Sequence, residues 1–207
     1  MRIDLENIGR RFNREWIFRG VTYGFEQGSS YAILGPNGSG KSTLLQVIAA
    51  NLTPSEGKID YLSANKKVDI ESAYKYLSWS APYIELIEEF TLQEQLDFHF
   101  KFKPYANQLN SKEVIELLGL EKSKNKTIRF FSSGMKQRTK LALSFCSDTP
   151  VLLLDEPTSN LDLKGIDWYY ELVNLFSKDR LLIICSNQEH EYSFCQHKLH
   201  LADYKQV

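Results

Sequence analysis

The sequence has no long apolar run, few cysteines and almost no net charge, and each shortage excludes a class of protein. Its longest apolar run is the five-residue segment Leu181–Cys185, whereas a helix needs about 20 apolar residues to cross a bilayer. Three cysteines among 207 residues leave at least one thiol unpaired, which excludes a disulfide scaffold. The 25 basic and 26 acidic residues give a formal net charge of −1, so we expect no nucleic-acid partner.

The remaining composition is that of an ordinary globular protein. The chain is 43% hydrophobic and 25% charged, and it is long enough for one large domain or one domain with an inserted subdomain. Asp4 and Glu6 interrupt the first apolar stretch, so we expect no secretory signal. We therefore expect reduced, buried thiols in a cytoplasmic protein.

Strand patterns occupy both ends of the chain and helix patterns occupy the middle. Apolar residues alternate with polar ones around residues 3–5 and 21–25, and short buried-strand runs follow at 31–34, 151–154 and 181–184. A helix pattern covers 42–50, and another separates the last two runs, which predicts parallel strands. Residues 83 to about 140 read as a helical insertion in an α/β protein, with helix starts at Thr91-Leu-Gln-Glu94, Asn110-Ser-Lys-Glu113 and Ser132.

One glycine-rich segment matches the phosphate-loop pattern GxxxxGK[ST] at every fixed position, between a predicted strand and a predicted helix. Glycines let successive backbone N–H groups point inward, and the helix N-terminus adds partial positive charge. Lys41 would reach the β- and γ-phosphates, the Ser42 hydroxyl would bind Mg²⁺ and Thr43 would bond the α-phosphate. The predicted ATP-binding residues of this segment are Gly35, Pro36, Asn37, Gly38, Ser39, Gly40, Lys41, Ser42 and Thr43.

Two carboxylates follow the apolar run 151–154. An aspartate at the end of such a strand holds Mg²⁺ in phosphate-loop NTPases, which makes Asp155 the second predicted metal ligand beside Ser42. Glu156 is placed to polarise the attacking water and is a predicted catalytic residue, together with Lys41. Acidic residues are common after strands, so it is the neighbouring phosphate loop that favours a site here.

These motifs, with Phe131-Ser-Ser-Gly134-Met135 and Ser159-Asn-Leu-Asp162, resemble the ATP-binding subunit of ABC transporters over essentially the whole chain. In size the chain is similar to compact subunits such as those of haem exporters. The resemblance implies an α/β P-loop NTPase: a RecA-like, mostly parallel sheet with an N-terminal antiparallel β subdomain and an inserted helical subdomain. One ABC ATP-binding domain would span 1–207, with the core and β subdomain at about 1–82 and 141–207 and the helical subdomain at about 83–140.

The resemblance also implies partners and further site residues. ATP and Mg²⁺ would lie between two subunits, most simply a homodimer, which would drive a separate transmembrane permease from the cytoplasmic face of the membrane. Adenine would stack on Phe12. The signature residues Ser132, Ser133 and Gly134 would contact the nucleotide bound to the other subunit, and Asp162 would lie in the D-loop. Residues 83–90 fit either ordinary packing or a docking surface for the membrane partner.

Three positions depart from the family pattern. Ser133 stands where the family has glycine, Trp79 falls where it has a metal-site glutamine, and Asn187 falls where it has the switch histidine. We assign Asn187 the catalytic role at the γ-phosphate, with His190 as the alternative. The leading function is the ATP-hydrolysing motor of a transporter, slowed by these departures. The alternative is a nucleotide-sensing or non-transport ABC ATPase with little hydrolysis.

Overall fold

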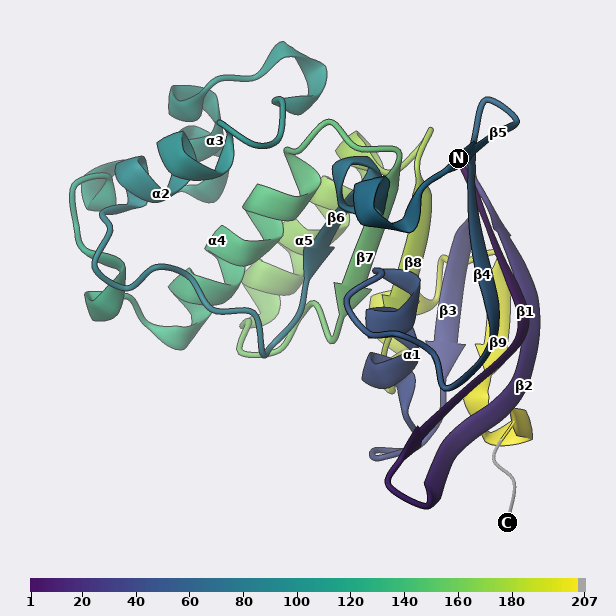
Figure 1. Ribbon diagram of the computed structural model, residues 1–207. Helices are drawn as coiled ribbons and strands as arrows, with labels where there is room; N and C mark the ends of the chain where they lie inside the picture. Colours follow the sequence, from purple (N-terminus) through teal and green to yellow (C-terminus); the bar gives the residue numbers. More distant parts are fainter. Residues whose placement is uncertain (205–207) are drawn as a thin grey trace.

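The computed structural model describes residues 1–204, so the last three residues of the predicted domain lie outside the described residues. Two sheets dominate it (Figure 1). An antiparallel sheet has the order β2-β1-β4-β5, and a five-stranded sheet has the order β6-β7-β8-β3-β9 with every pair parallel. The strands are β1 (Arg2–Phe12), β2 (Glu15–Glu26), β3 (Ser30–Leu34), β4 (Glu56–Ser63), β5 (Lys66–Val68), β6 (Leu77–Ser80), β7 (Val151–Asp155), β8 (Leu181–Cys185) and β9 (His197–His200).

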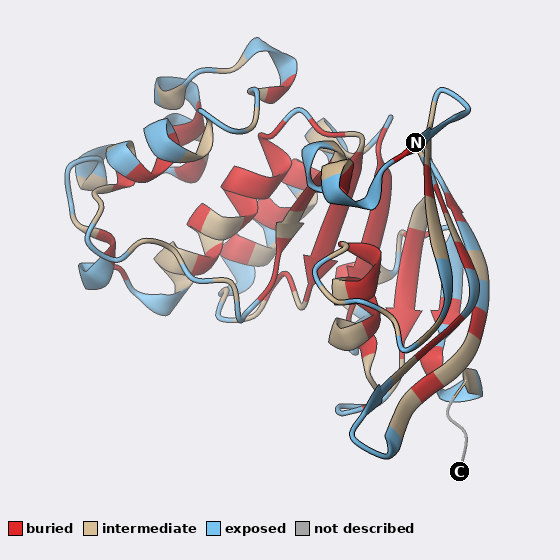
Figure 2. Ribbon diagram, viewed as in Figure 1, coloured by how far each residue is buried: buried red, intermediate tan, exposed pale blue. Residues whose placement is uncertain are grey.

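The parallel sheet is buried on both faces, as its uninterrupted apolar runs predict. Because successive side chains point to opposite faces of a strand, Ile33 and Leu153 enter one core cluster while Leu152 and Leu154 enter the other. Figure 2 shows the central strands almost entirely buried. The ends of these strands therefore form a rigid base for the loops that follow them.

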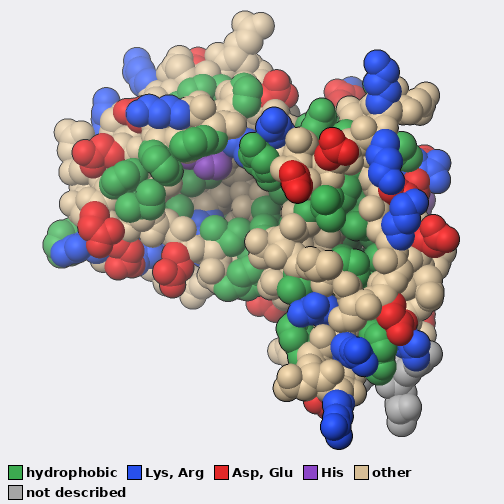
Figure 3. Space-filling model, viewed as in Figure 1, with side chains coloured by type: hydrophobic (Ala, Val, Ile, Leu, Met, Phe, Trp, Pro, Cys, Tyr) green, Lys and Arg blue, Asp and Glu red, His purple; other side chains and the backbone are tan. Residues whose placement is uncertain are grey.

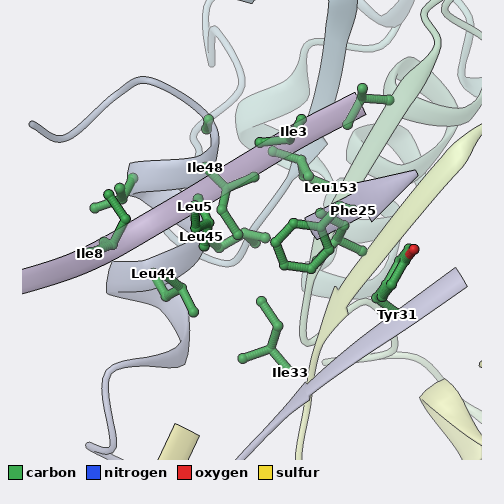
Figure 4. Close-up of a cluster of buried hydrophobic side chains, with 14 of the residues drawn as sticks. Ile3, Leu5, Ile8, Phe25, Tyr31, Ile33, Leu44, Leu45, Ile48 and Leu153 are labelled. Carbon is green, nitrogen blue, oxygen red and sulfur yellow. The ribbon is translucent and has the colours of Figure 1, made fainter. Parts of the chain in front are cut away.

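The first core cluster joins the antiparallel sheet to helix α1 (Lys41–Ile48). Ile3 and Leu5 of β1 meet Leu45 and Ile48 of α1, and Leu153 of β7 closes the cluster from the parallel sheet (Figure 4). Leu5 is 2% exposed and the other four are fully buried or nearly so. This packing fixes the helix that follows the phosphate loop against both sheets.

The second cluster lies on the other face of the parallel sheet and includes helices α4 (Ser133–Phe145) and α5 (Leu163–Phe176). Helices α2 (Leu92–His99) and α3 (Ser111–Leu118) extend away from the sheet at one end of the molecule, and a four-residue helix α6 (Glu189–Tyr192) follows β8 (Figure 1). Helix α4 runs across residue 140, where the helical subdomain was predicted to end. The insertion and the core are therefore joined by a continuous helix there.

Capping residues start the helices of the insertion where the sequence places them. Thr91 and Asn110 each form a reciprocal capping box, with Glu94 and Glu113 respectively. The Ser132 hydroxyl accepts a hydrogen bond from the backbone N–H of Met135 and caps α4. These helix starts depend on contacts within four residues, which is why local sequence patterns locate them.

Candidate nucleotide-binding site

The phosphate loop connects β3 with α1, and a glycine is required at its last turn. Gly40 is the N-cap of α1 and has a φ of +99°, a left-handed conformation. A Cβ atom at Gly40 would lie 2.3 Å from the Cγ2 atom of Ile17 on β2. Only glycine combines this backbone conformation with this close approach. The tight turn brings the loop over the N-terminus of α1, where unpaired N–H groups and the helix dipole favour an anion.

The Lys41 ammonium lies folded over the loop and is buried. Its Nζ atom donates to the carbonyl oxygens of Gly35, at 2.8 Å, and Pro36, at 3.2 Å. Charge-assisted bonds to phosphate are stronger than bonds to neutral carbonyls, so a phosphate would compete well for this cation. An open cavity of about 280 Å³ faces the loop, lined by Ile17, Asn37, Gly38, Gly40, Lys41, Ser42, Thr43 and Glu156.

Asp155 ends β7 as a buried carboxylate, and neither of its oxygens accepts a well-formed hydrogen bond within residues 1–204. Burial raises its pKa, and the negative charge of Glu156 adds to the rise, while the Ser42 and Tyr83 hydroxyls and the Lys41 charge oppose it. A buried carboxylate without a donor beside a serine hydroxyl is a hard-oxygen pair of the kind that Mg²⁺ prefers. Asp155 and Ser42 therefore fit a magnesium ion.

Protein side chains alone do not complete a metal cage within residues 1–204, because no group of three or more His, Cys, Asp or Glu side chains converges there. Magnesium is commonly held by one or two carboxylates together with substrate phosphates. Near the C-terminus, His197 stacks on the Tyr31 ring with centroids 4.8 Å apart.

Glu156 lies at the edge of the same cavity with a φ of +44°, in the left-handed region. Its backbone N–H donates to the Cys185 carbonyl of β8 at 2.9 Å. The following turn is held from a second side: the backbone N–H of Thr158 donates to the Glu191 carboxylate of α6 at 2.7 Å. Glu191 is completely buried. The surrounding structure thus imposes a conformation on Glu156 that non-glycine residues rarely adopt.

The loop after β8 brings Asn187, and not His190, to the phosphate loop. The Asn187 Nδ2 atom donates to the Oδ1 atom of Asn37 at 2.5 Å. His190 lies on α6 and its Nε2 atom pairs with the Thr158 hydroxyl at 2.9 Å. Of the two sequence candidates, Asn187 is therefore the one that contacts the phosphate loop, and its role at the γ-phosphate stays a prediction.

Comparison with known proteins decides the family. The family model described as ABC transporter matches residues 18–159, which contain the phosphate loop, Ser132–Gly134 and the Asp155–Glu156 pair. This chain belongs to the ABC transporter family.

The relatives are ABC transporter ATP-binding proteins. The uncharacterized proteins YcbN and YybJ of Bacillus subtilis are each 29% identical to the chain, over 86% and 91% of its length. The aligned regions cover 58% of YcbN and 86% of YybJ. A putative ABC transporter ATP-binding protein from Pyrococcus furiosus superposes with a TM-score of 0.82 at 20% identity, covering all of both chains. The dimeric cassette MJ0796 gives 0.80 at 23% identity, covering 96% of this chain and 94% of its own.

Trp79 is the residue that the family resemblance places at the glutamine position of the metal site. Trp79 is inside strand β6 and its side chain packs against the first core cluster. The ring of Tyr83, four residues later, meets the Trp79 indole edge to face, with the ring centroids 5.6 Å apart. Burial, and secondarily the Asp155 charge, raises the pKa of Tyr83, so its phenol stays protonated at neutral pH. The place of Trp79 at the family's glutamine position stays a prediction.

The predicted signature residues lie at the exposed N-terminus of α4. Ser132 and Ser133 are exposed, so their side chains are accessible to a second molecule. A Cβ at Gly134 would lie 3.1 Å from the Asn160 carbonyl, so the predicted signature and the predicted D-loop segment 159–162 approach closely. Asp162 of that segment caps α5, accepting from the Gly165 N–H at 2.8 Å. Its visible role within one chain is therefore structural.

Phe12 lies beside the turn between β1 and β2, and 47% of the residue is exposed. The Arg10 guanidinium packs over the ring at 4.6 Å from its centroid. One face of Phe12 is thus covered by a cation, and adenine stacking on this residue stays a prediction.

Two surface properties complete the description of this ABC protein. No helix within residues 1–204 combines the length and the apolarity that a bilayer crossing requires. Acidic and basic side chains are intermixed over the face seen in Figure 3, in line with the near-zero net charge.

Proposed function

We propose that this chain binds and hydrolyses ATP as the motor subunit of an ABC transporter. The single observation that supports this best is the buried Asp155 carboxylate, which lacks a donor, faces the Ser42 hydroxyl and adjoins a phosphate loop with a buried lysine. A buried charge without a partner is costly, and a bound cation with its nucleotide would compensate that cost.

In this proposal, different residues bind the phosphates, the metal ion and the attacking water. Lys41 and the N-terminus of α1 would hold the phosphates, and Asp155 with Ser42 would hold Mg²⁺. When bound, Mg²⁺ supplies positive charge that offsets the charge developing on the transferred phosphoryl group. Glu156 would accept a hydrogen bond from the attacking water and orient it, while the Asn187 amide would donate to the γ-phosphate. A neutral amide stabilises developing charge less than a cation does, so turnover is expected to be slow.

The exposed signature supports an ATP-bound homodimer. In this proposal Ser132 and the N-terminus of α4 meet the γ-phosphate held by the partner, so closure of the dimer depends on ATP. The ABC relatives include the Nod factor export ATP-binding protein I of Rhizobium, at 30% identity over 89% of this chain. On this likeness we place a separate transmembrane component beside the dimer, at the cytoplasmic face of the membrane.

The assignment is tested by Lys41→Ala. Removing the buried ammonium should weaken Mg-ATP binding at least tenfold or abolish phosphate release, since a charge-assisted contact with phosphate is lost. Lys140→Ala is the matched control, because Lys140 donates to the carbonyls of Ala81 and Pro82, outside the phosphate loop. Unchanged ATP affinity together with unchanged turnover in Lys41→Ala would overturn the proposed function.

Asn187 also supports a second candidate function, in which the chain senses nucleotide by binding ATP and hydrolyses little of it. Its amide holds the Asn37 side chain of the phosphate loop and cannot become a cation. Intact ATP binding without phosphate release, even in the presence of detergent-solubilised membrane partners, would favour this alternative over the motor.

A further inference from the structure

Gln137 connects helix α4 with the turn that carries Glu156. The residue is 2% exposed, and its Nε2 atom donates to the Pro157 carbonyl at 2.7 Å. It lies about one turn into α4, about 6 Å along the axis from the first residue of the helix. The backbone of α4 also approaches the segment after Glu156 at a second point, where Gly134 faces the Asn160 carbonyl. The first turn of α4 is therefore packed directly on this segment.

The hydrogen bond from Gln137 completes a set of three that hold consecutive residues of the turn. The Glu156 N–H is held by β8 and the Thr158 N–H by α6. Pro157, between them, has no N–H, so its carbonyl is its only hydrogen-bonding backbone group, and α4 holds it through Gln137. A backbone in the left-handed region, as at Glu156 with a φ of +44°, persists only where its surroundings fix it from several sides.

We propose that Gln137 is a positioning residue for Glu156, and that its hold on the Pro157 carbonyl fixes how the Glu156 carboxylate enters the nucleotide cavity. This rests on the proposed function, because it requires Glu156 to orient the attacking water. A misplacement of about 1 Å at a reacting group can lower a rate on the order of a hundredfold. If Gln137 only stabilised the fold, its loss would reduce the amount of folded protein and leave the rate per bound nucleotide unchanged.

Two quantities test the proposal in each variant: the rate of phosphate release per bound nucleotide at saturating Mg-ATP, and the Kd of a fluorescent ATP analogue. Gln137→Met keeps a side chain of similar length and removes the amide donor. Thr139→Val is the matched control. Thr139 is completely buried two residues later on α4, and its hydroxyl donates to the Met135 carbonyl within the same helix.

We expect Gln137→Met to release phosphate about tenfold more slowly or worse, with Kd within about twofold of the wild-type value. Thr139→Val should match the wild type in both quantities. In the Glu156→Gln background, where the carboxylate is already absent, Gln137→Met should lower the single-turnover rate of hydrolysis much less, because a positioning residue acts through the group that it positions.

An unchanged rate in Gln137→Met, a loss of affinity as large as the loss of rate, or the same fold-loss with and without the Glu156 carboxylate would overturn the role of Gln137. If Gln137→Met does not fold, Gln137→Leu, which also lacks a donor, decides by the same measurements. The proposed function fails differently: the wild type itself would then bind no ATP or release no phosphate, or Lys41→Ala would equal it in both.

Discussion

Adding one methyl group to Gly40 should damage the protein far more than adding it to Gly38, two residues earlier in the same loop. Both glycines are left-handed, with φ of +99° and +76°. A Cβ at Gly40 would lie 2.3 Å from Ile17 and 3.2 Å from Phe18, whereas a Cβ at Gly38 would have nothing within 4 Å. The two positions therefore separate backbone strain from steric overlap.

The magnitudes follow from these two contributions. A left-handed alanine costs about 1 kcal/mol or somewhat more, which is the whole expected effect of Gly38→Ala. Gly40→Ala adds overpacking against a core-facing strand, worth about 1–3 kcal/mol. We therefore expect a loss of about 3 kcal/mol for Gly40→Ala, a large share of the 5–15 kcal/mol typical of a domain.

Urea unfolding followed by circular dichroism measures both variants, and a double-mutant cycle with Ile17→Ala isolates the overlap. Because Ile17→Ala removes the colliding methyl group, the double variant should recover about 1 kcal/mol or more relative to the sum of the single changes. Equal destabilisation by Gly38→Ala and Gly40→Ala, or additivity of Gly40→Ala with Ile17→Ala, would refute the reasoning. The phosphate loop would then accommodate a Cβ atom at Gly40 without the overlap with Ile17.

Three further predictions concern the site and its surroundings. Asn187→Ala should lower steady-state phosphate release about tenfold and His190→Ala much less, because only Asn187 reaches the phosphate loop; the reverse ranking would place His190 at the γ-phosphate. Glu156→Gln should give an ATP-bound dimer by size-exclusion chromatography and a monomer with ADP, and a monomer in both contradicts the dimer. Burial lowers the pKa of Lys103 from 10.5 to about 8, so the unfolded chain holds more protons than the folded chain between pH 8 and 10.5. The free energy of unfolding of the wild type should therefore rise relative to that of Lys103→Met as the pH rises through this window. The same pH dependence of the unfolding free energy in both proteins would contradict this prediction.

Features set by neighbouring residues could be predicted from the sequence. The capping boxes at Thr91 and Asn110 form where the local pattern indicates them. The buried-strand runs at 151–154 and 181–184 pair in parallel, as their separation by a helix predicts. In each case one short segment contains the residues that determine the geometry.

The contacts of Tyr83 and Asn187 could not be predicted in the same way. The pattern of β6 continues to Ser80 without a turn residue, so nothing local shows that the Tyr83 ring packs on the Trp79 indole. Asn187 and Asn37 are 150 residues apart and meet only because β8 and β3 are adjacent in the sheet. Helix α6, only four residues long, turns His190 away from the phosphate loop. Tertiary packing determines these positions.

The backbone N–H of Thr158, which donates to the buried Glu191 carboxylate, can report local opening of the structure around it. That N–H belongs to the residue two positions after Glu156, and it can exchange with solvent deuterium only when its hydrogen bond to Glu191 opens. The Tyr169 hydroxyl of α5 also holds α6, through the Glu191 carbonyl at 2.9 Å. The isotope-exchange rate at this single position therefore reports how often the segment around Glu156 is released, on timescales of minutes to hours that turnover measurements do not sample.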